Sequence, residues 1–261
     1  MPRIHATAVV HDRARLAPDA SVGPFCVVGP AAVLGPGVEL VAHVVVDGAT
    51  ELGPNTRIAP FAVVGGRPQH RGDDGADGRV VLGAGCDVRE HVTVHRGTGS
   101  GVTCVGAGTL LMVGSHVAHD CVLGDRVTLA NNVQLGGHVE LGDGCWVGGN
   151  AGIHQFVRVG AGAFVGGGAV LLRDLLPHAM ATGNPACVAG LNLVGLRRAG
   201  VSRVSIRAAQ AVLETLFSPG PAPLSERALQ LQADATDPLV RQILEFARAP
   251  GPRRLLRPAL P

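Results

Sequence analysis

An aliphatic residue recurs at every sixth position of this chain as far as Leu171. The period holds in three runs: Ile4, Val10, Leu16, Val22, Val28, Leu34, Leu40, Val46, Leu52, Ile58 and Val64; then Leu82, Val88 and Val94; then Val105, Leu111, Val117, Leu123, Leu129, Leu135, Leu141, Val147, Ile153, Val159, Val165 and Leu171. The residue four positions after each aliphatic is usually small or β-branched, as at Ala20 and Ala62. Such a hexapeptide period predicts a parallel β-helix, in which each coil buries its aliphatic side chains against the next coil.

The composition agrees with an interior built from small aliphatic side chains. Aromatic residues make up only 3% of the chain, whereas glycine contributes 38 residues and often follows the periodic aliphatic, where the chain must bend at a corner. Four of the six cysteines fall on the second inward position: Cys26, Cys86, Cys121 and Cys145. No two cysteines have Cys-x-x-Cys spacing, so we interpret these four as interior filling and not as a disulfide or zinc framework.

The six-residue register breaks twice, and both breaks are predicted to be loops. The first lies between Val64 and Leu82 and is polar and glycine-rich over residues 66–78. The second follows Val94 and contains residues 96–101. Because binding residues usually reside in loops held by a rigid scaffold, these two segments are candidates for ligand contact.

Beyond Leu171 the period stops, and a helical pattern begins near residue 191. The pattern predicts helices at Val201–Phe217, Leu224–Ala233 and Pro238–Ala249, the last with Asp237 as N-cap and Pro238 in the first turn. The arginine- and proline-rich end from Pro250 onward is expected to be frayed. The predicted fold class is therefore an all-β parallel β-helix over residues 1–190, followed by a C-terminal α-helical domain over residues 191–261.

Charge and hydropathy exclude two classes of partner. The formal net charge is only +2, and the chain has no lysine and few aromatics, so it offers no platform for nucleic acid. No apolar run approaches the roughly 20 residues of a membrane span, and because the repeat already begins at Ile4 we expect no signal peptide. We therefore expect a cytoplasmic protein.

Histidines gather at one outer edge of the predicted solenoid. His119 and His138 are separated by 19 residues, His138 and His154 by 16, and His95 joins them once the second loop is discounted. None occupies an inward position, so we expect four exposed imidazoles in a column on successive coils. Imidazole titrates near pH 6.5, which suits a group that removes a proton near neutrality.

Several segments resemble the acyl-[acyl-carrier-protein]–UDP-N-acetylglucosamine O-acyltransferases, a family of hexapeptide-repeat enzymes. The matching segments are residues 23–30 (GPFCVVGP), 43–48 (HVVVDG), 92–98 (VTVHRGT), 116–121 (HVAHDC), 129–132 (LANN), 137–138 (GH), 154–156 (HQF), 183–186 (GNPA) and 192–198 (NLVGLRR). They extend through the predicted helical domain. The resemblance implies a left-handed β-helix with three hexads per coil and a homotrimer. It also implies transfer of a (3-hydroxy)acyl group from acyl carrier protein to the 3-hydroxyl of UDP-N-acetylglucosamine, the first step of lipid A biosynthesis.

The resemblance assigns roles to matching positions. His119 would be the general base, Asp120 would orient its imidazole, and the Gly137 N–H would stabilise the oxyanion. The substrate-binding positions would be Gln69, His116, His138, His154, Gln155, Phe164, Gly167, Asn192 and Arg198. Among these, Arg198 would contact phosphates and Phe164 would restrict acyl-chain length. No metal and no separate cofactor is implied, because the acyl group arrives on the phosphopantetheine of the carrier protein.

Three positions depart from the family pattern. His70 and Gly72 stand where the family has Asp-x-Lys in the first loop, and Val194 stands where it often has a glutamate. These departures leave open a different acceptor, such as a 3-amino nucleotide sugar.

Two other readings concern the histidines and the helical domain. The histidines leave open a zinc carbonic anhydrase-like protein of the same fold, and a catalytically inactive scaffold is disfavoured by the His119–Asp120 pair. Arg197, Arg203 and Arg207 could meet the acidic carrier protein or could simply form a solvated helix surface.

Overall fold

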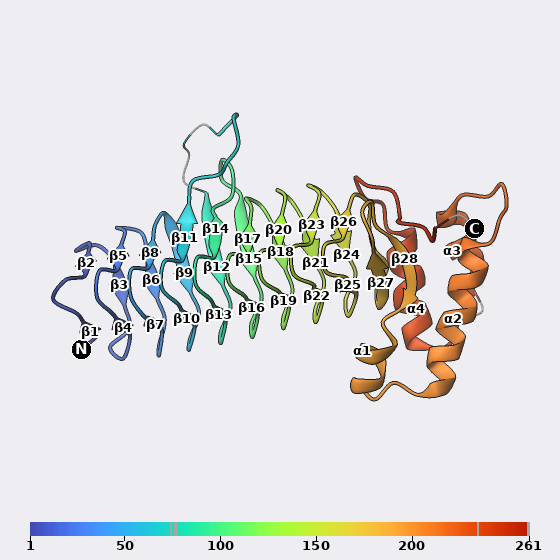
Figure 1. Ribbon diagram of the computed structural model, residues 1–261, viewed down its shortest axis with the longest axis horizontal. Helices are drawn as coiled ribbons and strands as arrows, with labels where there is room; N and C mark the ends of the chain where they lie inside the picture. Colours follow the sequence, from blue (N-terminus) through green and yellow to red (C-terminus); the bar gives the residue numbers. More distant parts are fainter. Residues whose placement is uncertain (74, 76–77, 234, 260–261) are drawn as a thin grey trace.

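Three sheets, parallel except for the last strand of one of them, form the faces of a long prism (Figure 1). The computed structural model describes residues 1–73, 75, 78–233 and 235–259. Sheet A comprises β1 (Arg3–Ile4), β4 (Ser21–Val22), β7 (Glu39–Leu40), β10 (Arg57–Ile58), β13 (Asp87–Val88), β16 (Leu110–Leu111), β19 (Thr128–Leu129), β22 (Trp146–Val147), β25 (Phe164–Val165), β27 (Ala179–Thr182) and β28 (Cys187–Leu191). Sheet B comprises β2 (Val9–Val10), β5 (Val27–Val28), β8 (Val45–Val46), β11 (Val63–Gly66), β14 (Thr93–His95), β17 (His116–Val117), β20 (Gln134–Leu135), β23 (Gly152–Ile153) and β26 (Val170–Leu171). Sheet C comprises β3 (Arg15–Leu16), β6 (Val33–Leu34), β9 (Ala49–Leu52), β12 (Arg79–Leu82), β15 (Val102–Val105), β18 (Val122–Leu123), β21 (Glu140–Leu141) and β24 (Arg158–Val159).

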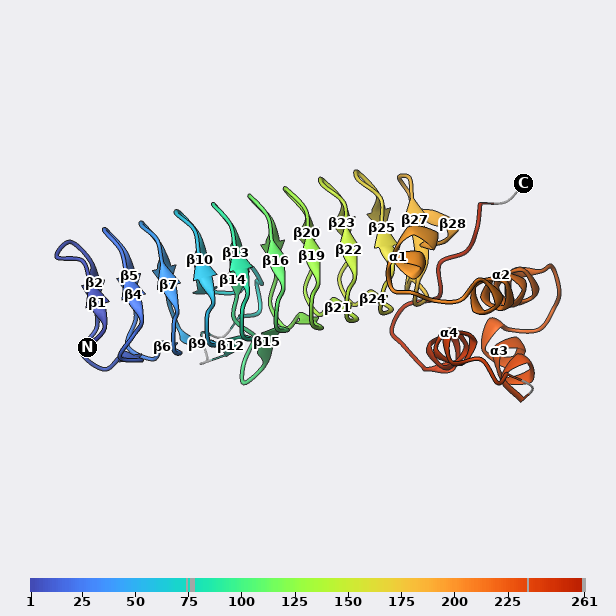
Figure 2. The ribbon, with the colours of Figure 1, turned by 90° about the horizontal axis from the view of Figure 1, so that it is seen from below.

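The strand register confirms the predicted parallel β-helix. Val22 pairs with Leu40, and Leu40 pairs with Ile58, so residues eighteen positions apart stack on successive coils. The coil ladder is visible from below in Figure 2. Because each coil supplies the backbone partners of the next coil, two-residue strands suffice to build the sheets.

The periodic aliphatic side chains form the core. Leu34, Leu40 and Leu52 are each 1% exposed, and the four cysteines predicted to be interior are buried. Ile4 obeys the same period but is 46% exposed, and its strand pairs with β4 alone. The sequence pattern therefore predicts which residues point inward, while the stacking decides how deeply they are buried.

Both register breaks form loops, as predicted. One lies between β11 and β12 and the other between β14 and β15, and Figure 1 shows both projecting from the same edge of the prism. Positions 74, 76 and 77 of the first loop lie outside the described residues. Near the end of β11, just before this loop, Gly65 has a φ of 88°, and a Cβ there would lie 1.9 Å from the Asp47 carbonyl oxygen, so only glycine fits.

An antiparallel pairing of β27 with β28 ends the solenoid, and the described residues beyond it form four helices. They are α1 (Leu193–Arg198), α2 (Arg203–Phe217), α3 (Leu224–Ala233) and α4 (Pro238–Arg248). Asp237 caps α4 as predicted, since its carboxylate accepts hydrogen bonds from the N–H groups of Leu239 and Val240. No helix in the described ranges is long and apolar enough to cross a membrane.

The expectation of a frayed C-terminus is wrong for the described residues beyond Pro250. This segment lies along the end of the solenoid, where Leu256 N–H donates to the Asp174 carbonyl at 2.7 Å and Val188 N–H donates to the Arg257 carbonyl at 2.9 Å. Leu256 is 5% exposed. We call the described residues from Pro250 onward the C-terminal strap. Composition alone could not predict how this strap packs, because its hydrogen-bond partners are more than sixty residues away in the sequence.

Candidate active site

The turns that connect sheet B to sheet C hold the predicted catalytic residues. His119 and Asp120 follow β17, and Gly137 and His138 follow β20 on the next coil. Carrying the β17–β20 register through these turns places His119 beside Gly137 and Asp120 beside His138. The four side-chain positions therefore belong to one corner of the prism.

The expected single column of histidines needs a correction. The same register places His95 and His154 at one position of the turn, His119 at the next position and His138 at the one after it. Separations of 16 and 19 residues are not multiples of eighteen, so the imidazoles occupy three adjacent positions of one corner. This offset brings the rings into contact, with the centroids of His119 and His138 5.2 Å apart in an edge-to-face arrangement.

A hydrogen bond joins His119 to Asp120. The distance from His119 Nδ1 to Asp120 Oδ2 is 2.8 Å, and each side chain is 11% exposed. Because an ionised carboxylate can only accept, Nδ1 carries the proton in this pair and Nε2 is left as the basic nitrogen. This is the geometry that a general base and its orienting carboxylate require.

Thr98, in the second loop, fixes the Asp120 carboxylate from the other side. The Thr98 hydroxyl donates to Asp120 Oδ2 at 2.8 Å, and its N–H lies 3.2 and 3.1 Å from the two carboxylate oxygens. Burial acts to raise the pKa of the Asp120 carboxyl, but the hydrogen bonds from His119 and Thr98 outweigh burial and hold that pKa below its ordinary value. The carboxylate is thus kept charged.

Thr103 also supports this residue, since its hydroxyl accepts the Asp120 N–H at 2.8 Å. The sequence reasoning had missed both threonines. Thr98 lies in a segment that matched the family, so the match was the signal that could have found it.

Gly137 packs against the His119 ring. A Cβ at this position would lie 2.5 Å from His119 Cε1 and 2.7 Å from Nε2, so any larger residue would displace the imidazole. Within the described part of the chain, the Gly137 N–H has no hydrogen-bond partner. A free N–H beside the basic nitrogen is the donor that a developing oxyanion needs.

The expectation that the histidines are exposed is wrong for two of them, because the loops cover them. Taken as whole residues, His95 is 8% exposed and His119 is 9% exposed. His70, from the first loop, lies edge-on to His119 with ring centroids 5.3 Å apart. One of the positions that depart from the family pattern is therefore in direct contact with the candidate base.

His116 and His95 form a second pair of rings beside the first. Their ring centroids are 4.7 Å apart, and His116 Nδ1 lies 2.8 Å from the Thr93 hydroxyl. Burial, with the nearby His95 and His119, lowers the pKa of His116 to about 4. Burial, followed by His119, lowers the pKa of His95. Both rings are therefore neutral near pH 7 and can act as hydrogen-bonding groups.

Three further predicted substrate-binding residues, His154, Gln155 and Gln69, lie near this corner but are not part of either pair of histidine rings. His154 and Gln155 follow β23, one coil beyond Gly137, and both are exposed. The Arg253 guanidinium, from the C-terminal strap, lies 2.9 Å from His154 Nδ1 and donates to the Gln155 carbonyl at 3.2 Å. Gln69 is exposed in the first loop, next to His70.

Four others lie elsewhere in the chain. Phe164 is on sheet A, paired in register with Trp146, and Gly167 follows it at the corner between sheets A and B. Asn192 caps α1, where its side chain accepts the Gly195 N–H and donates to the Gly162 carbonyl, and Arg198 is the last residue of α1. The fold of one chain does not bring Phe164 and Gly167 to the corner that holds His119.

Three ligand atoms at the corner lie close enough together to hold a metal ion. One ligand atom from each of His119, Asp120 and His138 lies within 4.8 Å of the others. Two nitrogens and one oxygen are a donor set that zinc accepts. However, Asp120 Oδ2 already accepts hydrogen bonds from Thr98 and His119, so a metal would have to displace them. Metal analysis of the purified protein tests this alternative directly.

Comparisons with known proteins agree with this geometry. Residues 138–173 match the bacterial transferase hexapeptide family, and residues 174–255 match domain 2 of the UDP-N-acetylglucosamine O-acyltransferases. The acyl-[acyl-carrier-protein]–UDP-N-acetylglucosamine O-acyltransferase of Caulobacter vibrioides is 45% identical over 98% of each chain. The enzyme of the same name from Sinorhizobium fredii is 42% identical over 98% of this chain and 96% of its own length.

Solved structures show the same relationship. The UDP-N-acetylglucosamine acyltransferase from Campylobacter jejuni superposes with a TM-score of 0.91 at 34% identity, covering 98% of this chain and 99% of its own. The left-handed β-helix and the histidine–aspartate pair at its corner, together with these matches, place the chain among the hexapeptide-repeat acyltransferases. Within that class, the chain belongs to the acyl-[acyl-carrier-protein]–UDP-N-acetylglucosamine O-acyltransferase family.

Proposed function

We propose that this protein transfers a (3-hydroxy)acyl group from the thioester of acyl carrier protein to the 3-hydroxyl of UDP-N-acetylglucosamine, the first step of lipid A biosynthesis. The observation that carries the proposal is the His119–Asp120 hydrogen bond of 2.8 Å beside the free N–H of Gly137. The family membership supplies the donor and the acceptor. A cytoplasmic location and a homotrimeric assembly belong to the same proposal.

The reaction follows from the positions of these groups. His119 Nε2 removes the proton from the sugar hydroxyl as its oxygen attacks the thioester carbonyl carbon. The Gly137 N–H stabilises the negative charge on the former carbonyl oxygen, and Asp120 stabilises the imidazolium. The C–S bond then breaks, and the departing sulfur takes the proton back from His119. The ester product and the carrier thiol balance the reaction without a further cofactor.

The separation of the two corners supports the homotrimer. Gly167, proposed to bound the acyl tail, lies between sheets A and B, whereas His119 lies between sheets B and C. An acyl chain held at His119 can reach a Gly167 corner if that corner comes from a neighbouring copy. In a cyclic trimer each chain would then contribute a His119 corner to one neighbour and a Gly167 corner to the other.

Replacing His119 with alanine tests the mechanism. The variant should lose about 10²- to 10⁴-fold in kcat, since that is the usual contribution of a positioned general base. The assay is mass spectrometry of the products formed from a panel of acyl-carrier thioesters and UDP-N-acetylglucosamine. His11→Ala, an exposed histidine of the first coils, is the matched control and should keep full activity. A His119→Ala enzyme with more than a tenth of the wild-type rate would show that the base lies elsewhere.

The same assay decides the acceptor. His70 contacts His119, so the altered first loop lies where the acceptor hydroxyl must bind. We expect faster transfer to the hydroxyl acceptor than to its 3-amino analogue. A large preference for the amine would contradict the proposed acceptor while leaving the reaction type intact.

A further inference from the structure

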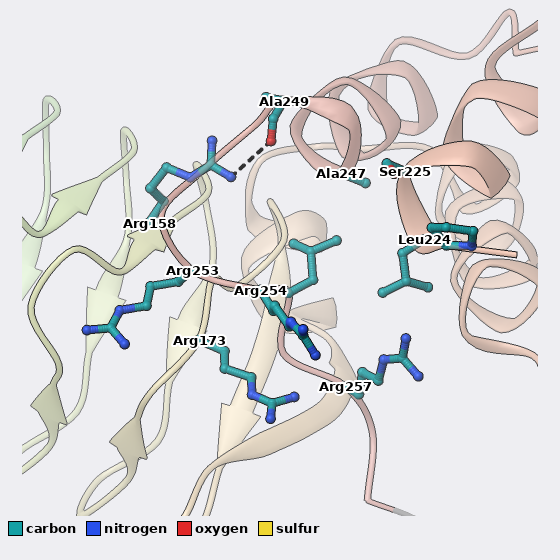
Figure 3. A pocket seen from close by; sticks show the side chains of 11 residues that line it. Arg158, Arg173, Leu224, Ser225, Ala247, Ala249, Arg253, Arg254 and Arg257 are labelled. Atoms are coloured by element: carbon teal, nitrogen blue, oxygen red, sulfur yellow. Dashed lines mark hydrogen bonds between the residues drawn. The ribbon is translucent and has the colours of Figure 1, made fainter.

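An arginine-lined hollow lies where the last coils meet the helical domain and the C-terminal strap (Figure 3). Its volume is about 550 Å³, which is within the range of small-molecule sites. The eleven residues that line it include five arginines and no carboxylate: Arg158, Arg173, Pro223, Leu224, Ser225, Ala247, Ala249, Arg253, Arg254, Leu255 and Arg257. The proposed reaction assigns no role to this hollow.

Two of the five arginines, Arg158 and Arg253, form hydrogen bonds that connect the last coils to the C-terminal segment. Arg158 forms an ion pair with the fully buried Asp174 at 2.8 Å and donates to the carbonyls of Ala249 and Pro250. Arg253 is bonded to His154 and Gln155. These contacts fasten the strap to the last coils, so the wall of the hollow is built before any ligand arrives.

The other three arginines have no such partner. Arg173, Arg254 and Arg257 are exposed, and none makes a side-chain hydrogen bond or ion pair with another residue in the part of the chain that the structure describes. Figure 3 shows the three side chains beside one another at the edge of the hollow. Three neighbouring guanidinium groups repel one another unless an anion lies between them, and their forked donors match phosphate oxygens.

The opposite wall adds backbone donors. Helix α3 begins at Leu224, and Leu224 and Ser225 both line the hollow. The first N–H groups of a helix have no partner within the helix and attract an anion. Glu226, in the same first turn, is not among the lining residues.

The hollow also continues the corner that holds the candidate base. The β23–β26 register, carried past its last pair, places Arg173 beside Gln155, and Gln155 lies one coil beyond Gly137. A phosphate in the hollow would therefore lie at the end of the catalytic corner. Its source is either a free polyphosphate or the phosphodiester of the acyl donor.

We propose that this hollow is a phosphate-binding site, in which Arg173, Arg254, Arg257 and the start of α3 hold a ligand that carries phosphate groups. The inference goes beyond the proposed function, because binding here requires neither catalysis nor the nucleotide residues Asn192 and Arg198.

Calorimetric titration of the full-length protein with inorganic pyrophosphate tests the site. We expect saturable binding at near-physiological ionic strength, and at least a tenfold weaker affinity in the double variant Arg254→Gln/Arg257→Gln. The backbone carbonyls of these residues, not their side chains, fasten the strap, so the fold should persist; an unchanged melting temperature checks this.

Two matched variants separate the hollow from other basic surfaces. Arg241→Gln on the exposed face of α4 removes the same charge outside the hollow, and Arg198→Gln alters the proposed nucleotide site. Arg241→Gln should bind pyrophosphate as the wild type does, and Arg198→Gln should keep the binding that the double variant weakens, even where it loses separate binding at the nucleotide site. Equal weakening by Arg241→Gln, equal binding by the double variant, or no binding by the wild type would each overturn the proposal.

Steady-state kinetics then identify the source of the phosphate. Competition between pyrophosphate and the acyl donor, with a raised donor KM in the double variant, assigns the site to the donor phosphodiester. Pyrophosphate binding without such competition assigns it to a free polyphosphate. A raised donor KM in a protein that never binds pyrophosphate would instead reveal a surface for the carrier protein itself, and the proposal would be wrong.

Discussion

Replacing Gly137 with alanine should damage catalysis through the position of one ring. The new Cβ would lie 2.5 Å from His119 Cε1, whereas such contacts are about 3.5 Å at their optimum. The imidazole would have to move by about 1 Å, which is enough to break its 2.8 Å hydrogen bond to Asp120. Because alanine keeps the backbone N–H, the oxyanion donor is still present. A misplacement of this size costs about 100-fold in kcat, or about 3 kcal/mol of transition-state stabilisation.

The matched control is Gly152→Ala on the next coil, where a Cβ would meet no atom within 4 Å. Initial rates at saturating donor and acceptor give kcat for both variants, and urea unfolding shows whether either has lost stability. We expect the control to retain wild-type kcat. If Gly137→Ala kept kcat within threefold of wild type while remaining folded, the claim that catalysis depends on the seat of His119 would be refuted.

Two further predictions concern His116 and the acyl pocket. The folded-state pKa of His116, about 4, lies below its unfolded value of 6.5, so its contribution to stability is full above pH 6.5 and is lost as the pH falls towards 4. Between about pH 7.5 and about pH 5, urea unfolding should show a loss of stability that is about 2 kcal/mol smaller in His116→Gln than in the wild type. The control Gln134→Ala, on the next coil, should lose as much stability as the wild type. If the free energy of unfolding of His116→Gln fell with pH as steeply as that of the wild type, the assignment would be contradicted. Phe164→Ala should raise the rate with longer acyl donors by about tenfold relative to the preferred donor, measured by competition between two thioesters, because it enlarges the proposed acyl pocket. An unchanged preference would exclude Phe164 as the limit on chain length.

Much of the fold could be predicted from the sequence because the constraint repeats. Each hexad indicates which of its residues points inward. A wrong assignment in one hexad is therefore revealed by the hexads one coil before and after it. The helix at Leu224–Ala233 was predicted with the observed bounds, and Asp237 was predicted as the cap of the last helix. These are local signals, set by side-chain period and by hydrogen bonding within one turn.

The features that escaped prediction depend on contacts between distant segments. Whether His119 is exposed is decided by two loops whose paths the period does not specify. The Thr98–Asp120 hydrogen bond spans 22 residues across an inserted loop, and the strap around Leu256 pairs with Asp174. In the candidate site, residue types were predictable from the family resemblance, but their burial and the contact of His70 with His119 required coordinates.

The corner that holds the candidate base resembles another corner of the prism, at which aromatic and histidine rings with positive φ stack on successive coils. At the corner between sheets A and B, Phe25, His43, Phe61 and His91 all adopt positive φ and stack face to face, with centroids 4.9–5.1 Å apart. The left-handed backbone is costly for such side chains, by roughly 1–2 kcal/mol per residue, and ring stacking offsets part of that cost.

The corner between sheets B and C begins the same way, since His138 stacks on Phe156 at 4.5 Å and both have positive φ. One coil earlier the equivalent position is Asp120, also at positive φ, and there the ladder of rings stops. A ring at that position would cover the next ring, whereas the shorter carboxylate places Oδ2 2.8 Å from His119 and 3.7 Å from His138 Nε2. Because the stack of rings ends at Asp120, this corner holds a carboxylate, the basic nitrogen of His119 and the free N–H of Gly137 on two successive coils. A structural stack is thereby replaced by a site that can carry out proton transfer.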